Sequence, residues 1–274
     1  MTAIPKHPDF CHRPLVTDIP AVSVAGLPAA LRAFCHRPLS YRLNHLQSRY
    51  DVAFDGYSYP GQEDSRNQGP EDRLHSFVFS DFSPQEKYPP EFQAFISTCW
   101  APLCRQVHAL EQSLLLALGL APVASQHQRH FGHMMSANYY PAGNPVQPGS
   151  SPLRLSAHPD VSLLTVFVQG LGHGFQYRDP TGCWRDAPVT HTVTVFAGEL
   201  LEWLSDGTVP ALRHRVRQQP NDSERFSFAL FSLPQPGASL HSIAGATIST
   251  EDWYRLHLSQ WDDTGYSRQD ISRP

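Results

Sequence analysis

The chain has 274 residues, of which 41% are hydrophobic, and its 21 basic and 25 acidic residues give a formal net charge of −4. A chain of this length and hydrophobic content can bury one large core, so we expect a single domain over residues 1–274. The sequence holds no basic block that could neutralise a phosphate backbone or an anionic lipid surface, which argues against nucleic-acid and membrane partners.

The sequence also indicates where the protein works. Its most apolar run, 114–124, is short and is interrupted by Gly119 and Pro122, so we expect neither a membrane span nor an apolar leader. Its five cysteines are an odd number without CxxC spacing, which argues against a disulfide framework and a structural zinc cluster. We therefore expect a soluble, cytoplasmic, monomeric protein with reduced thiols.

The first 130 residues predict a partly helical region. Residues 1–70 are rich in proline, histidine, arginine and glycine and hold only one short helical candidate, at 27–34. From Glu91 to Leu118, apolar residues recur at intervals of three and four, which is the period of a helix with one buried face. Pro102 lies inside this run and predicts either the start of a second helix or a kink.

After Gly132 the apolar pattern changes to short β-rich runs separated by turns, within a region that we place at 131–235. We expect strands at 134–140, 163–169, 175–178, 190–196, 213–216 and 226–230. Many short strands that follow a helical region predict a mainly β fold with flanking helices, arranged as a sandwich or barrel.

The last region, 236–274, predicts a C-terminal helix and a tail. Ser249 and Asp252 have the spacing of a capping box, in which a serine hydroxyl and an acidic side chain bind the first free backbone N–H groups. The helix that follows would carry Trp253, Leu256 and Trp261.

The tripeptide His-Pro-Asp occurs at 7–9 and again at 158–160. Because the chain has 15 histidines and 25 acidic residues, about one HxD or HxE triplet is expected by chance, so the context must decide. Residues i and i+2 of a strand point the same way, so His158 and Asp160 could reach one metal ion at the end of a strand. Pro159 favours an extended conformation at His158. The first triplet has no strand beside it, and we interpret it as part of a solvated tail.

An iron site built from two histidines and one carboxylate needs a third ligand from a distant strand. His214 is a candidate, because polar and apolar residues alternate around it. In the strand that follows, Arg225 and Ser227 share one face, while the apolar residues at 226, 228 and 230 share the other. A buried guanidinium requires an anionic partner, and no matching acidic residue is apparent, so we expect it to bind the carboxylate of a ligand. Asn138 and Tyr140 share a face of an earlier strand and could orient the same acid.

These motifs occur in an order that resembles a known family. They are NYYP at 138–141, HPD at 158–160, SLLTVFVQ at 162–169, GFQYRDPTGCW at 174–184, HRV at 214–216 and ERFSFALF at 224–231. GYSYPG at 56–61 and the helical stretch at 103–120 precede them. Together, between residues 56 and 234, they resemble the isopenicillin N synthase-like group of Fe(II)- and 2-oxoglutarate-dependent oxygenases.

The resemblance implies a double-stranded β-helix, or jelly roll, in which His158, Asp160 and His214 bind Fe(II). It implies that Arg225 and Ser227 bind the distal carboxylate of 2-oxoglutarate, assisted by Tyr140 and Asn138, and it implies no catalytic residue beyond the metal ligands. A protein of this kind uses O2 to hydroxylate or desaturate an unactivated C–H bond, with release of succinate and CO2. The expected substrate is a small molecule of the natural-product type.

The sequence departs from the family at two places. The middle residue of the metal triplet is usually threonine in the family and is Pro159 here, which is not a ligand position. The usual opening strand and Asn-His-Gly segment are not recognisable in the N-terminal third, where Asn44-His45 is at most a remnant. Two alternatives stay open: an Fe(II) oxidase of the same fold that does not use 2-oxoglutarate, and a non-catalytic jelly-roll protein that binds a small acid.

A further group of histidines, at 127, 130 and 133, follows the spacing of a metal-binding triplet. No carboxylate accompanies these residues in the sequence, so we expect no second metal site there.

Overall fold

Two long antiparallel strands form the centre of the fold: β4 (Phe131–Tyr140) and β11 (Arg225–Pro234) pair along their whole length.

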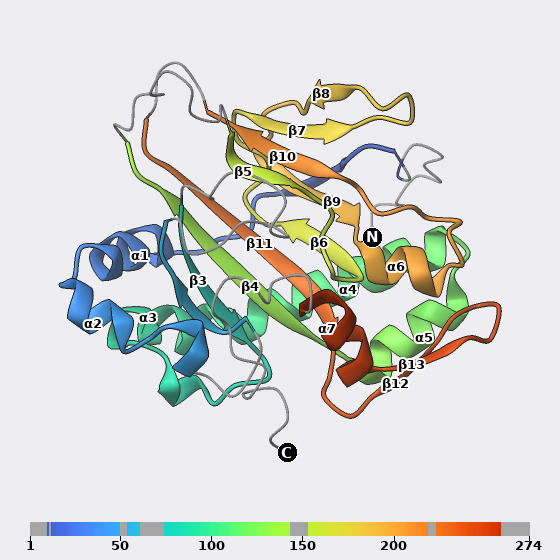
Figure 1. Ribbon diagram of the computed structural model, residues 1–274, viewed down its shortest axis with the longest axis horizontal. Helices are drawn as coiled ribbons and strands as arrows, with labels where there is room; N and C mark the ends of the chain where they lie inside the picture. Colours follow the sequence, from blue (N-terminus) through green and yellow to red (C-terminus); the bar gives the residue numbers. More distant parts are fainter. Residues whose placement is uncertain are drawn as a thin grey trace.

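The computed structural model describes residues 10, 12–49, 54–60, 74–142, 153–218 and 223–258 (Figure 1). The N-terminal His-Pro-Asp triplet and Trp261 lie outside the described residues.

The strands make two larger sheets and one small ribbon. The seven-stranded sheet has the order β1 (Leu15–Pro20), β9 (Thr192–Ala197), β6 (Leu164–Phe167), β11, β4, β3 (His75–Ser80) and β2 (Gly56–Ser58). The four-stranded sheet has the order β5 (Leu153–His158), β10 (His214–Arg217), β7 (Phe175–Arg178) and β8 (Trp184–Asp186). The ribbon pairs β12 (Ser239–His241) with β13 (Thr247–Ser249). Every strand pair is antiparallel, so the mainly β fold with flanking helices is confirmed.

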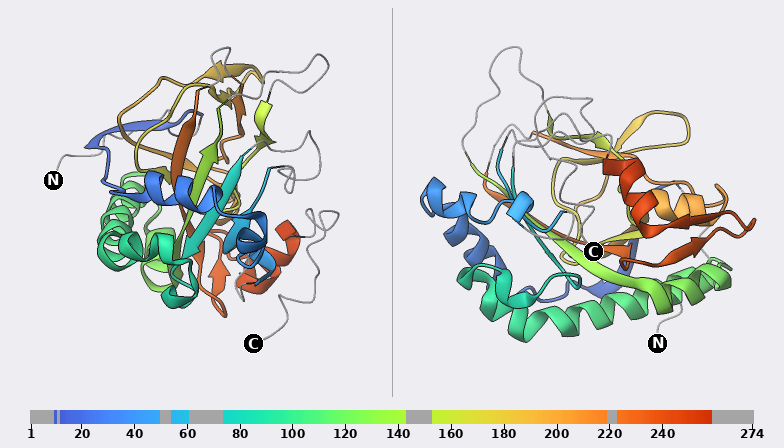
Figure 2. Two further views of the ribbon diagram at one scale, coloured as in Figure 1. Left: turned by 90° about the vertical axis from the view of Figure 1, so that its left-hand side faces the viewer. Right: turned by 60° about the horizontal axis from the view of Figure 1, so that its bottom comes forward.

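The helices lie largely on the outer side of the seven-stranded sheet (Figures 1 and 2). They are α1 (Leu27–Cys35), α2 (Leu39–Leu43), α3 (Pro90–Phe95), α4 (Ala101–Ala117), α5 (Ala121–His130), α6 (Glu199–Leu204) and α7 (Thr250–Leu258), with short turns η2 (Gln47–Arg49), η3 (Gln85–Lys87) and the π-helical η4 (Ile96–Trp100). In the right view of Figure 2, α3, η4, α4 and α5 form a continuous layer below β4.

Helix α4 shows why the period of three and four predicted this layer. Leu103, Val107 and Leu114 are buried on one face of the helix. Pro102 lies in the first turn of α4, directly after the π-helical turn η4 that joins α4 to α3. The residues at both junctions keep right-handed helical dihedrals, so the type of helix changes beside Pro102 while the helical path continues from α3 into α4.

The described residues form one main apolar core and two smaller clusters, and strand parity along β11 separates the main core from the smaller ones. Phe228 and Leu230 of β11 point toward the helical layer and belong to the main core. Ala229 faces the other way and belongs to a smaller cluster with Phe167 and Phe196 of the large sheet and Phe175 and Val216 of the small sheet. This second cluster fills the space between the two sheets, so the inner face of β11 lines the interior of the sandwich, as its sequence pattern predicts.

Several elements agree with the sequence, and others were missed. The strand at 175–178 was predicted with its observed bounds. Ser249 makes its half of the predicted capping box, because its Oγ accepts from the Asp252 backbone N–H at 3.0 Å, whereas the Asp252 carboxylate accepts from the Ser249 hydroxyl at 2.8 Å. The sequence did not predict β5 or the three N-terminal strands. Strand β1 contains Asp and Pro, which are rare in strands, and β5 mixes Arg, Ser and His with two leucines.

The structure also bears on two expectations drawn from the composition, one about membrane-spanning helices and one about disulfides. No helix among them has both the length and the apolar character that crossing a membrane requires. Their four cysteines, Cys35, Cys99, Cys104 and Cys183, form no disulfides. The division into three regions within one domain stays a prediction.

Candidate metal centre and acid-binding pocket

His158, Asp160 and His214 converge where the four-stranded sheet meets the loop after β5. His158 ends β5, His214 begins β10, and the two are register partners in this antiparallel pair. One candidate ligand atom from each of the three residues lies within 4.8 Å of the other two. Asp160 Oδ1 is 3.5 Å from His158 Nε2 and 3.9 Å from His214 Nε2. The three predicted metal ligands are therefore neighbours in the fold.

The backbone orients both imidazole rings. His158 Nδ1 lies 2.7 Å from the Ser156 carbonyl oxygen, and His214 Nδ1 lies 3.2 Å from the Leu212 carbonyl oxygen. A carbonyl can only accept, so each Nδ1 carries the proton and each Nε2 turns a lone pair toward Asp160. Burial lowers the pKa of His214 to about 4, so this ring is neutral at pH 7, as a metal ligand must be.

The Asp160 carboxylate is fixed from the side opposite the histidines. The hydroxyl of Thr165, a buried residue of β6, donates to Asp160 Oδ2 at 2.5 Å, which leaves Oδ1 to face the two rings. Burial alone would raise the pKa of Asp160, but the interactions with His214 and His158 outweigh it and hold the pKa below its usual value. The carboxyl group is therefore ionised at neutral pH.

The loop that carries Asp160 rests on the start of α6. The backbone N–H of Glu199 donates to the Asp160 carbonyl at 2.8 Å, and that of Leu200 donates to the Ser162 carbonyl at 3.1 Å. A Cβ atom on Gly198 would lie 2.1 Å from the Ser162 carbonyl oxygen. Since φ of Gly198 is −101°, close approach of the two backbones, rather than an unusual backbone conformation, requires glycine at this position.

Arg225 lies on the inner face of β11, opposite Tyr140 of β4. Its guanidinium carbon is 4.9 Å from the centre of the Tyr140 ring. Arg225 Nε and Nη1 are buried and have no hydrogen-bond partner among the described residues. A Cβ atom on Gly172 would lie 2.9 Å from Arg225 Nε, so this glycine makes room for the guanidinium group. Two buried, unsatisfied cationic donors are costly unless an anion binds them.

Ser227 and Asn138 lie on the same face, at the next pair of inward-pointing positions along the two strands. They are partners in the β4–β11 pair, two residues from Arg225 and Tyr140 respectively, so all four residues point the same way. The Ser136 hydroxyl donates to Asn138 Oδ1 at 2.9 Å and so orients the amide. The structure therefore brings together the four residues predicted to bind an acid.

Sequence reasoning missed three residues that contribute to this region. Thr165 and Gly198 position the Asp160 loop, and no motif marks either of them. Arg154 is buried on β5, and its guanidinium carbon lies 5.7 Å from the Tyr140 ring, so the four-stranded sheet brings a second cation to this pocket. The sequence does contain a sign of Arg154: Arg154, Ser156 and His158 lie two residues apart, so they share one face of a strand. It was missed because β5 was not predicted as a strand.

The donors fit the groups that the sequence implies. Two imidazoles and one carboxylate are the donor set of the facial site typical of non-haem Fe(II) oxygenases, in which three positions on the metal stay open. The unsatisfied guanidinium of Arg225 fits a bound carboxylate. The residues present are thus compatible with both Fe(II) and an organic acid.

Comparison with known proteins gives a family match and partial relatives. Residues 131–234 match the sequence profile of the 2OG-Fe(II) oxygenase superfamily. The chain is 36% identical over 91 residues to the 2-oxoglutarate-dependent dioxygenase AOP3 of Arabidopsis thaliana, which covers 33% of this chain and 22% of AOP3. It is 25% identical over 234 residues to the protein DMR6-LIKE OXYGENASE 1 of the same plant, which covers 80% of this chain and 63% of the relative. The chain thus spans less than two thirds of either relative.

The fold also matches solved structures. The full-length T7H of Neurospora crassa in complex with alpha-KG superimposes with a TM-score of 0.65 and 21% identity, covering 93% of this chain and 84% of T7H. This likeness confirms the double-stranded β-helix. The profile match runs from β4 to β11 and includes all seven predicted site residues. We conclude that residues 131–234 belong to the 2OG-Fe(II) oxygenase superfamily, as the resemblance to its isopenicillin N synthase-like group predicted.

Proposed function

We propose that this protein is an Fe(II)- and 2-oxoglutarate-dependent dioxygenase. The observation that carries the proposal is the pair of unsatisfied donors on Arg225, which face the same interior as the cluster of two histidines and one aspartate. A metal site alone would fit many activities. A metal site beside an unpaired buried cation fits one that uses an organic acid together with the metal.

His158, Asp160 and His214 would hold the Fe(II) ion. When bound, Fe(II) activates O2 for decarboxylation of 2-oxoglutarate to succinate and CO2, coupled to oxidation of a substrate C–H bond. The protein keeps the three ligands in position through Thr165 and the carbonyls of residues 156 and 212. No other side chain is assigned a catalytic role.

Arg225 and Ser227 would bind the distal carboxylate of 2-oxoglutarate. The planar guanidinium can donate from Nε and a terminal nitrogen to both oxygens of one carboxylate, which fixes the orientation of the acid as well as its position. Tyr140 and Asn138 line the same face and would assist. Gly172 leaves the space that this geometry needs.

The proposed substrate is a small molecule, of the natural-product type, which is hydroxylated or desaturated. Phe175 and Phe196 lie 5.1 and 5.0 Å from the His214 ring, so an apolar wall adjoins the proposed metal and excludes water from it. We further propose that the protein acts as a cytoplasmic monomer without nucleic-acid or membrane partners, a proposal supported by its dispersed charge.

Removing a proposed metal ligand tests the activity. We expect His158→Ala or His214→Ala to abolish succinate formation, because two remaining ligands cannot hold the ion in position. The assay follows succinate release in a substrate screen, together with O2 consumption measured with and without 2-oxoglutarate. Full turnover by either variant would contradict the iron assignment. Equal O2 consumption without 2-oxoglutarate would support the oxidase alternative, and binding without turnover would support the acid-binding alternative.

Replacing Arg225 tests the acid site. We expect Arg225→Ala to raise KM for 2-oxoglutarate by about 10- to 100-fold, the range expected for a lost charge-assisted hydrogen bond. Arg225→Lys should recover only part of this loss, because lysine cannot form two parallel bonds. Arg217→Ala, which removes an exposed arginine of β10, is the matched control and should leave KM unchanged. An unchanged KM in Arg225→Ala would rule out this binding mode.

The contact between Gly198 and the Asp160 loop makes a further prediction. We expect Gly198→Ala to weaken Fe(II) binding by about 10- to 100-fold, because the new methyl group must displace the loop that carries the ligand. Gly207→Ala, just beyond α6, is the control: its Cβ meets no atom within 4 Å, although its φ of +77° makes the substitution strained. Fe(II) affinity measured by anaerobic titration should fall only in the first variant. An equal fall in both would indicate a general loss of stability instead.

A further inference from the structure

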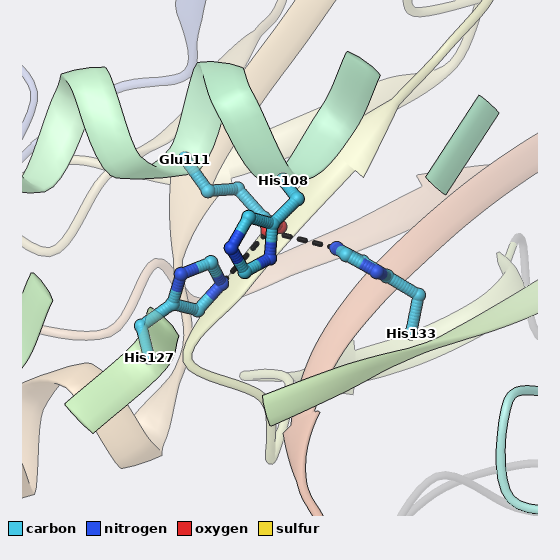
Figure 3. Close-up of side chains that lie close together, drawn as sticks. All are labelled: His108, Glu111, His127 and His133. Atoms are coloured by element: carbon cyan, nitrogen blue, oxygen red, sulfur yellow. Dashed lines mark hydrogen bonds and ion pairs between the residues drawn. The ribbon is translucent and has the colours of Figure 1, made fainter. Parts of the chain in front are cut away.

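A second cluster of potential metal ligands lies between the helical layer and the seven-stranded sheet (Figure 3). It consists of His108 and Glu111 of α4, His127 of α5 and His133 of β4, and their candidate ligand atoms all lie within 4.8 Å of one another. The sequence predicted no metal site here because no carboxylate accompanied the histidines at 127, 130 and 133. The missing carboxylate is Glu111 of α4, which the fold brings into contact with His127 and His133. His130 is not part of the cluster.

This cluster is separate from the proposed iron centre. His133 lies on β4 at odd parity and faces the helices, whereas Asn138 and Tyr140 lie at even parity and face the interior of the sandwich. The β4 backbone therefore separates the two groups of side chains. Glu111 and His127 are fully buried, and His133 is 3% exposed.

The two oxygens of Glu111 have different surroundings. Oε2 lies 3.0 Å from His127 Nε2 and 2.9 Å from His133 Nε2. The side-chain amide of Gln112 donates to His127 Nδ1 at 2.6 Å, so His127 carries its proton on Nε2 and donates it to Glu111. Oε1 is buried and has no partner among the described residues. A buried carboxylate oxygen without a partner is costly, and it is available as a ligand.

His108 and His133 each have an acceptor group on the side away from Glu111. His108 Nε2 lies 3.2 Å from Gln128 Oε1, so a proton on Nε2 leaves Nδ1 with a free lone pair. His133 Nδ1 lies 3.8 Å from Asp81 Oδ2, which is beyond hydrogen-bond distance but close enough for the carboxylate to favour a proton on Nδ1. The lone pair of Nε2 then points toward Glu111, whose Oε2 is 2.9 Å away. A ring fixed by an outer acceptor is the usual arrangement of a metal-binding histidine.

We propose that a divalent transition-metal ion, Zn2+ by the nature of its donors, binds to His108, Glu111 and His133. Two imidazoles and one glutamate are a known zinc donor set, in which a fourth position stays open to another ligand. His127 acts as a positioning residue that holds Glu111 through Oε2. A pocket of about 500 Å3, lined in part by Cys104, His108 and His133, gives the ion a path of entry and room for the fourth ligand.

A network without metal is the competing arrangement. Burial lowers the pKa of His133, but the charge of Glu111 and the interactions with Asp81 and Cys104 outweigh it and raise the pKa well above the usual value. A proton on His133 could therefore balance the charge of Glu111. It would leave Glu111 Oε1 unsatisfied and would give His108 no role, whereas a metal ion satisfies both.

The experiment uses the full chain with the proposed iron site removed by His158→Ala and His214→Ala. Zn2+ binding to this double variant is measured by equilibrium dialysis, and Co2+ is used as a spectroscopic probe of its ligands. We expect one equivalent of Zn2+ per chain and a visible Co2+ spectrum typical of a four-coordinate site. Adding His108→Ala should weaken Zn2+ binding by at least about tenfold, whereas adding His130→Ala, the matched control, should not change it.

His108 is the position of choice because it is half-buried and makes no hydrogen bond to Glu111 in the structure, so its removal leaves the buried charge network intact. Circular dichroism establishes that each variant is folded. Failure of the double variant to bind Zn2+, or binding unaffected by His108→Ala, would overturn the proposal in favour of the proton-balanced network. Succinate formation by the wild-type chain is measured separately, so failure of this proposal leaves the proposed dioxygenase activity to be judged by its own assay.

Discussion

The pairing of β4 with β11 is the constraint on which both sites depend. Because ten successive residues of each strand pair without a bulge, side chains alternate strictly between two environments. On one face, this register places Tyr140 beside Arg225 and Asn138 beside Ser227, the four residues of the proposed acid pocket. On the other face, it directs His133 toward α4 and α5. A shift of register by one residue would turn Arg225 toward the helices and remove it from the proposed acid pocket.

The proposed metal centre depends on a second set of constraints, all of them local to the loop after β5. The β5–β10 pair brings His158 beside His214, but Asp160 lies beyond the end of the strand. Its position is set by hydrogen bonds from Thr165 and from the first backbone N–H groups of α6. Contact with Gly198 leaves no room for this loop to move toward the helix. The ligand geometry is therefore built by packing of neighbouring backbones as much as by the ligands themselves.

The sequence predicted those features that repeat along a single element. The alternation around Arg225 placed it on the inner face, and the period of α4 identified its buried side. It could not predict features that depend on contacts between distant segments. Strand β5 has too few apolar residues to be recognised alone, and Glu111 is 22 residues from His133, so only the packing of α4 against β4 shows that they meet. Nor does any local pattern show that Gly198 touches the Asp160 loop.

We propose that the metal and the acid occupy one interior, with Arg225 holding the acid beside the metal. An anaerobic titration of 2-oxoglutarate into the protein, with and without one equivalent of Fe(II), measures whether the two ligands bind next to each other. We expect one equivalent of bound 2-oxoglutarate, a visible absorption band that requires both Fe(II) and the keto acid, and weaker binding when Fe(II) is omitted. Binding of 2-oxoglutarate with the same affinity whether or not Fe(II) is present, and without the band, would contradict it.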